Sequence, residues 1–158
     1  MKGMRNVYTK VLRGSLVTDH AASLPSTLLD QWLVQDKVDL LGAILSVTNR
    51  PESAGPAYQE GMSWAMAELT RAAKPWQDAS ILFAEVLYHY WTEIVVADQL
   101  GGMFGKVREH EKIMLPSGSA IELVPGGYIN LLIDGGTTLL SAGNYYIVAT
   151  AILFYIER

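Results

Sequence analysis

The clearest hydrophobic pattern lies in residues 145–156, which read YYIVATAILFYI with Thr150 as the one clearly polar side chain. Side chains alternate between the two faces of an extended strand, so both faces of this strand are apolar. We expect one face to pack in a core and the other to be covered by the N-terminal half of the chain or by another subunit. The run of 12 residues is shorter than the 18 to 20 or so that a membrane-spanning helix needs. The candidate interface residues are Tyr145, Tyr146, Val148, Thr150, Ile152, Phe154 and Ile156.

Residues 109–144 repeat a simpler pattern, in which short runs rich in β-branched residues alternate with turn residues such as Pro-Ser-Gly and Pro-Gly-Gly. Strands about ten residues apart, separated by such turns, are typical of a β-sandwich or barrel. The glycine pairs at 101–102, 126–127 and 135–136 are predicted to supply positive φ in hairpin turns and bulges.

The N-terminal half gives a mixed pattern. Residues 6–18 and 38–48 predict strands, the first with a bend or bulge at Gly14. The segment TLLDQWLV, residues 27–34, follows a cap-like Ser26 and predicts a short helix or a loop. Residues 58–74 favour a helix by propensity but alternate equally well as a strand, and the aromatic content of residues 81–96 favours a strand. The choice between helix and strand stays open over residues 58–96.

These patterns together predict a mainly β fold: one antiparallel β-sandwich or jelly-roll domain spanning residues 1–158, with room for one or two short helices within residues 25–75. The length of 158 residues fits a single domain with its own core.

Charge and composition narrow the function. The net charge of −4 does not suit a protein that binds nucleic acid through its phosphates, and the chain contains no cysteine for thiol chemistry. The N-terminus has no apolar segment followed by a cleavage site, so we do not expect a secretory signal there. Residues 113–156 contain only two charged residues, Glu122 and Asp134, so the shortage of charge is concentrated in the β-rich part of the chain.

Candidate chemistry rests on three residues, His89, Glu93 and His110. A histidine and a glutamate four residues apart share one face of a helix, where they can bind a metal or act as an acid–base pair. The alternative is a partly buried histidine beside an exposed glutamate. A comparison with the cupin pattern favours this alternative, because Leu87 and Asn130 stand where two of the histidine ligands belong. We therefore predict no catalytic residue, no metal and no cofactor.

The β-rich segment from Glu109 to Arg158, with its IMLPSG, IELVPGG and INLLIDGG runs and its terminal YYIVATAILFYIE strand, resembles the closing strands of single jelly-roll virion proteins. The resemblance implies a capsid, vertex or decoration subunit, not an enzyme, which is located in the virion and packs against copies of itself and other coat proteins. Two alternatives remain: a cupin-like barrel that binds a small ligand or metal, and a cellular oligomeric interaction module in the cytoplasm.

Overall fold

A computed structural model describes most of the chain, in the residue ranges 5–18, 24–51, 61–72, 85–96, 110–114, 120–137 and 145–158. Every element in these ranges is a β-strand. The strands are β1 (Tyr8–Thr18), β2 (Leu24–Leu33), β3 (Val38–Pro51), β4 (Gly61–Ala72), β5 (Glu85–Val96), β6 (His110–Met114), β7 (Ile121–Leu123), β8 (Tyr128–Thr137) and β9 (Tyr145–Glu157).

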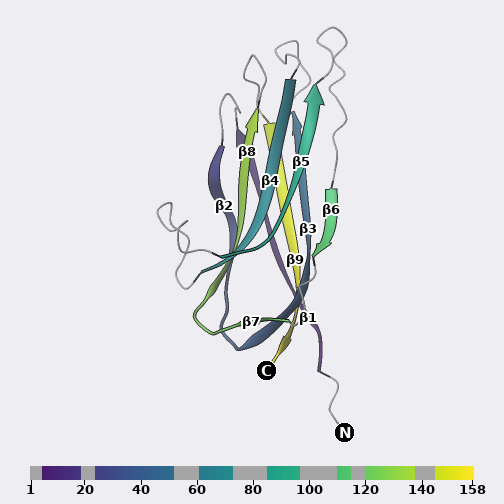
Figure 1. Ribbon diagram of the computed structural model, residues 1–158. Helices are drawn as coiled ribbons and strands as arrows, with labels where there is room; N and C mark the ends of the chain where they lie inside the picture. Colours follow the sequence, from purple (N-terminus) through teal and green to yellow (C-terminus); the bar gives the residue numbers. More distant parts are fainter. Residues whose placement is uncertain are drawn as a thin grey trace.

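The strands form two sheets that face each other (Figure 1). One has the order β1-β9-β3-β6, with the short β7 paired to β3, and the other has the order β2-β8-β4-β5. Every strand pair is antiparallel. The prediction of an antiparallel β-sandwich is confirmed.

The order of pairing identifies the kind of sandwich. With β7 set aside, the first main strand pairs with the last (β1 with β9), the second with the next to last (β2 with β8), and so on through β3 with β6 and β4 with β5. A long antiparallel ribbon of eight strands that rolls up on itself gives this nested pairing, and it is the jelly roll. Additional pairings of β9 with β3 and of β8 with β4 then complete the two sheets.

The core lies between the sheets and is built from alternate residues of each strand. On β9 the odd-numbered residues Ile147, Ala149, Ala151 and Leu153 have no exposed surface, and the core residues of the facing sheet include Ala67 of β4. Alternation therefore gives each long strand one core face and one outer face. The large side chains that are almost completely buried are Leu12, Leu40, Leu45, Leu69, Ile129, Leu131, Leu132, Ile133, Ile147 and Leu153.

The prediction of helices within residues 25–75 is wrong for the part of that range that the structure describes. Residues 24–33 form β2, and residues 61–72 form β4. The helix-forming residues of β4 are overridden because this strand is central in its sheet and pairs with β5 on one side and β8 on the other. The choice between helix and strand was open over residues 58–96. The structure has strands at 61–72 and 85–96.

Gly14 has a different role from the predicted bend or bulge. The register of β1 with β9 is continuous through Gly14, which pairs with Ala149. This position has no room for a larger residue, because a Cβ atom added there would lie 2.6 Å from the Cβ of Leu29 on β2. Close by, the backbone N–H of Arg13 donates a hydrogen bond of 3.0 Å to the carboxylate of Asp30. Gly14 thus lets β1 and β2, which belong to different sheets, approach closely.

Of the three glycine pairs, 101–102 lies outside the described residues, and the other two differ from each other. Gly126 has φ of 85° in the turn between β7 and β8, as a turn glycine requires. The N–H of Gly126 donates a hydrogen bond of 2.9 Å to the carbonyl of Val34. The N–H of Val34 donates one of 2.9 Å to the carbonyl of Gly127. Gly135 and Gly136 lie instead within β8, so the prediction of a turn is wrong for that pair.

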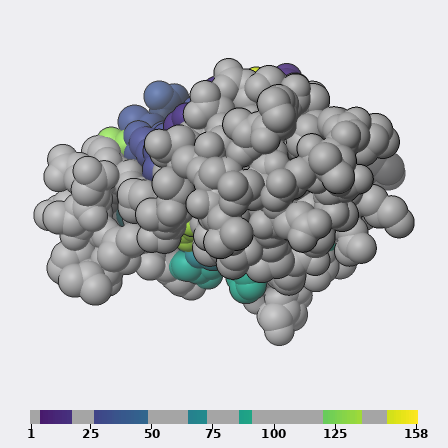
Figure 2. Space-filling view, turned by 90° about the horizontal axis from the view of Figure 1, so that it is seen from above, coloured from purple at the N-terminus to yellow at the C-terminus, as the bar shows by residue number. Residues whose placement is uncertain are grey.

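The view from above shows several separate patches of described residues at the surface (Figure 2). Purple and blue residues of the N-terminal strands are visible along the upper edge of this view, and teal residues from the middle of the chain along the lower edge. No helix in the described ranges is long and apolar enough to cross a membrane.

Candidate assembly surface

The outer face of β9 carries the even-numbered residues of the C-terminal run. All six of them are partly exposed, in contrast to the buried odd-numbered residues between them. The structure thus separates the two faces that the sequence left unassigned. The outer-face residues are Tyr146, Val148, Thr150, Ile152, Phe154 and Ile156. Tyr145, the seventh candidate, alternates with the core-face positions and lies outside the residues whose side chains are described.

The neighbouring strands continue this apolar face. Ile152 lies between Val11 of β1 and Ile44 of β3 in the register of the sheet. Val11 is 52% exposed, and Ile44 is partly exposed. Three β-branched side chains thus form a row across three adjacent strands. We call the outer face of β1, β9 and β3 the assembly face, with this row near its centre.

Polar residues of the assembly face lie in two rows beside the apolar one. Thr150 lies between Arg13 and Ser46 in the register. The Arg13 side chain is exposed and is the cation of this row. In the next row, Val148 lies between Ser15 and Thr48. A face of this kind has apolar area to bury and few charges to desolvate.

The end of the same sheet is tied together by Arg158, which follows β9. Its guanidinium binds both carboxylate oxygens of Asp39 at 2.8 Å and reaches Glu122 of β7 at 3.2 Å. Lys37 binds the other oxygen of Glu122 at 2.9 Å. The hydrogen bond from Lys37 is the main cause of the lowered pKa of Glu122, and the charges of Arg158 and Lys37 add to it. This cluster fixes β3, β7 and β9 to one another.

The three residues of the metal hypothesis are spread over both sheets. His89 and Glu93 lie on β5, and His110 begins β6 at the edge of the other sheet. On a strand, residues four apart are separated by about 13 Å, compared with about 6 Å on a helix. The structure therefore does not bring the backbones of His89 and Glu93 together. Among the described residues, no group of three histidine or acidic side chains is arranged to hold a metal ion.

The acidic partner of His89 comes from another strand. His89 is exposed and lies opposite Glu68 of β4 in the register, and Asp134 of β8 lies diagonally beyond Glu68. Burial raises the pKa of Glu68, the charge of Asp134 raises it further, and His89 opposes both effects. Sequence spacing alone missed Glu68 and Asp134, because only the pairing of β4 with β5 and β8 makes them neighbours of His89.

Asn130, which stands at a ligand position of the cupin pattern, has a structural role. It is fully buried and lies between Gln31 of β2 and Thr70 of β4. The amide of Gln31 donates a hydrogen bond of 2.7 Å to Asn130 Oδ1, and Asn130 Nδ2 donates a longer bond of 3.5 Å to Thr70 Oγ1. The three side chains form a polar ladder across three strands.

Comparisons with known proteins give matches among solved structures only. No family model matches the chain, and no curated protein matches it. An empty head of turnip yellow mosaic virus is 9% identical with a TM-score of 0.42, and the match covers 99% of this chain and 83% of that one. A 60-mer BFDV capsid protein is 8% identical with a TM-score of 0.39, with 99% and 95% covered. A Gx-strain infectious bursal disease virus structure is 12% identical with a TM-score of 0.35, with 98% and 36% covered.

These similar structures are of viruses and a capsid protein. Identities and TM-scores of this size do not establish a family. The jelly-roll topology itself rests on the strand pairing of this chain.

Proposed function

We propose that this protein is a structural subunit of a virion, as a capsid, vertex or decoration protein, and that it acts by packing against copies of itself. The observation that carries the proposal is the assembly face, whose central row of Val11, Ile152 and Ile44 remains partly exposed in the single chain. Jelly rolls are a recurrent fold of capsid domains.

A second copy of the chain is the occupant that we propose for the assembly face. The face is nearly uncharged along β9, and association between apolar surfaces needs no charge complement on the partner. Closed homo-oligomers are the commonest assemblies of soluble proteins, and they bury such faces in pairs or rings. Contacts with other coat proteins would use the surfaces that remain. The net charge of −4 favours protein partners over packaged nucleic acid.

The decisive measurement is the mass of the full chain in solution, by sedimentation velocity over a wide range of concentrations. We expect a closed or large homo-oligomer, which negative-stain electron microscopy would show as particles of uniform size. A chain that stays monomeric over the whole range would contradict the proposal.

A pair of lysine substitutions tests whether the assembly face is the surface involved. Ile152→Lys places a charge at the centre of the face and should reduce the measured mass to that of a monomer or small oligomer. Val86→Lys is the matched control, because Val86 is also an exposed apolar residue, 48% exposed, but lies on β5 at the edge of the other sheet. Equal loss of assembly in both variants, or in the control alone, would move the interface away from the assembly face.

A further inference from the structure

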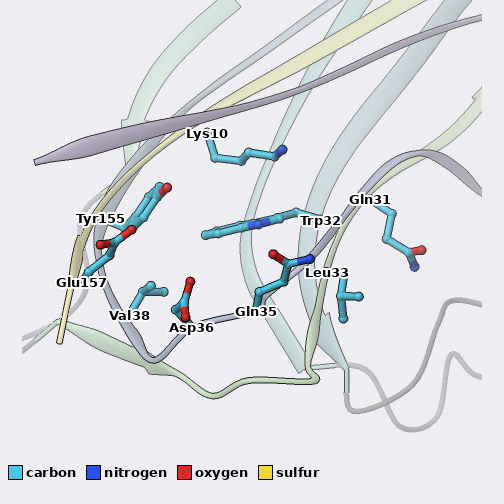
Figure 3. Close-up of a pocket in the computed structure, with 9 residues that line it drawn as sticks. All are labelled: Lys10, Gln31, Trp32, Leu33, Gln35, Asp36, Val38, Tyr155 and Glu157. Atoms are coloured by element: carbon cyan, nitrogen blue, oxygen red, sulfur yellow. The ribbon is translucent and has the colours of Figure 1, made fainter.

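A pocket of about 370 Å³ lies where β1, β2 and β9 meet, between the two sheets. Its size is within the range of small-molecule sites. Trp32 and Tyr155 form an aromatic wall, with ring centroids 5.1 Å apart and planes tilted by 42° (Figure 3). Tyr8 stacks on Tyr155 at 5.7 Å and holds that ring in place.

The rim of the pocket supplies hydrogen-bonding groups of both kinds. The Lys10 side chain runs along one side of Trp32, and the amide of Gln35 lies near the other side (Figure 3). The carboxylates of Asp36 and Glu157 complete the rim. Among the described residues, none of these four side chains forms a hydrogen bond or an ion pair within the protein. They offer ammonium and amide donors together with amide and carboxylate acceptors.

The charges on the rim restrict the ligand. An anion would meet the carboxylates of Asp36 and Glu157, and a cation would meet the ammonium of Lys10. A neutral ring with many hydroxyl groups meets neither difficulty, because a hydroxyl both donates and accepts hydrogen bonds. The apolar C–H face of such a ring can pack on the indole of Trp32, while its hydroxyls bond the rim.

We propose that this pocket binds a neutral sugar ring, stacked on Trp32 and hydrogen-bonded by Gln35, Asp36 and Glu157. The proposal is independent of the assembly proposed above, because no residue that lines the pocket belongs to the assembly face. The rim is open to solvent, since Gln35, Asp36 and Glu157 are exposed. Binding of a single sugar ring in such a site is expected with Kd on the order of 1 mM.

Saturation-transfer difference NMR tests the proposal with the full chain in whatever assembled state it adopts. The probes are the methyl glycosides of glucose, galactose, mannose and N-acetylglucosamine, with tetramethylammonium and methyl phosphate as charged probes. At least one glycoside should receive saturation, and quenching of tryptophan fluorescence by the same sugar should give the Kd. Binding of no glycoside, or tighter binding of either charged probe, would overturn the proposal.

Variants locate the binding. Gln35→Ala removes an exposed amide outside the core and should weaken binding about fivefold. Trp32→Leu keeps an apolar side chain against the core but removes the stacking surface, and should weaken binding about tenfold. Thr9→Ala is the control, because Thr9 is exposed beside Lys10 in the sequence but points to the opposite face of β1. A sugar that binds all three variants as it binds the unmodified chain is bound elsewhere, and the assignment of this pocket would be wrong.

Discussion

The two sheets of the sandwich are alike on their inner faces and different on their outer ones. The middle row of the assembly face consists of Val11, Ile152 and Ile44, which make no hydrogen bonds through their side chains. The other sheet carries polar groups across its strands, with the ladder through Asn130 in one place and Glu68 opposite His89 in another. The jelly-roll fold therefore requires only the apolar pattern of the inner faces, which both sheets have.

The outer positions of the two sheets differ in how their side chains are satisfied. The side chains of the polar ladder hydrogen-bond to one another within the second sheet, so they need no partner from outside it. A row of aliphatic side chains gains free energy only when something removes it from water. The comparison teaches that two sheets of one fold can differ in whether the side chains of their outer positions are satisfied within the sheet.

The sharpest test of the two faces of β9 uses neighbouring residues. Ala151→Glu buries a carboxylate at a position with no exposed surface, and we expect a loss of about 5 kcal/mol or more, comparable to the whole stability of a domain. Soluble yield and near-ultraviolet circular dichroism measure it. Ile152→Glu is the control, which should fold and lose only assembly. If Ala151→Glu folds normally, the assignment of the core face is incorrect.

The contact between the sheets can be tested at Gly14. Gly14→Ala places a methyl group 2.6 Å from the Cβ of Leu29 and 3.0 Å from its carbonyl oxygen. We expect a loss of about 2 to 3 kcal/mol, because both contacts are close to rigid backbone. Urea unfolding measures the change, with Ser15→Ala as the control at the exposed adjacent position. Unchanged stability of Gly14→Ala would show that β1 and β2 do not approach so closely.

The polar ladder of the second sheet should be worth more than the polar row of the first. Asn130→Ala leaves the amide of Gln31 without its partner, and we expect a loss of about 1 to 3 kcal/mol. Ser46→Ala, in the row beside Thr150, should change stability by no more than about 0.5 kcal/mol. Thermal unfolding of both variants compares the two. Equal losses would remove the distinction between the outer faces.

The smallest effects that we expect are changes in Tm of opposite sign on replacing Glu68 and Glu122, and both changes depend on pH. The pKa of Glu68 is raised in the fold, so its ionised form opposes folding at neutral pH, and Glu68→Gln should raise Tm at pH 7. The pKa of Glu122 is lowered in the fold, so its contribution to stability is present above the unfolded value and is lost as the pH falls through the lowered one. Glu122→Gln should therefore lower Tm at pH 7.

Both differences should shrink in acid, since glutamine resembles the protonated side chain. Thermal unfolding from pH 7 down to pH values below the lowered pKa of Glu122 measures both variants side by side. Changes of the same sign in the two variants would contradict the assigned environments.

The sequence predicted those features of the fold that depend on neighbours along the chain. Residues 145–156 were identifiable as a strand with two apolar faces, and Gly126 as a turn glycine, because alternation and turn chemistry are local. The strand β4 was not, because its Ala, Met, Glu and Leu residues favour a helix and only its pairing on both sides determines a strand. The proximity of Glu68 to His89 and of Gly14 to Leu29 depends on distant segments, which no local pattern contains.

The position of β9 in its sheet has a consequence for how the chain folds. β9 lies between β1 and β3, so these two strands join one sheet only through a strand that comes much later in the sequence. During synthesis this sheet cannot close until residues 145–157 have emerged, and both β1 and β3 present unpaired edges until then. Contacts of such long sequence separation slow folding. The sheet that contains β1, β9 and β3 therefore forms only after β9 has been made.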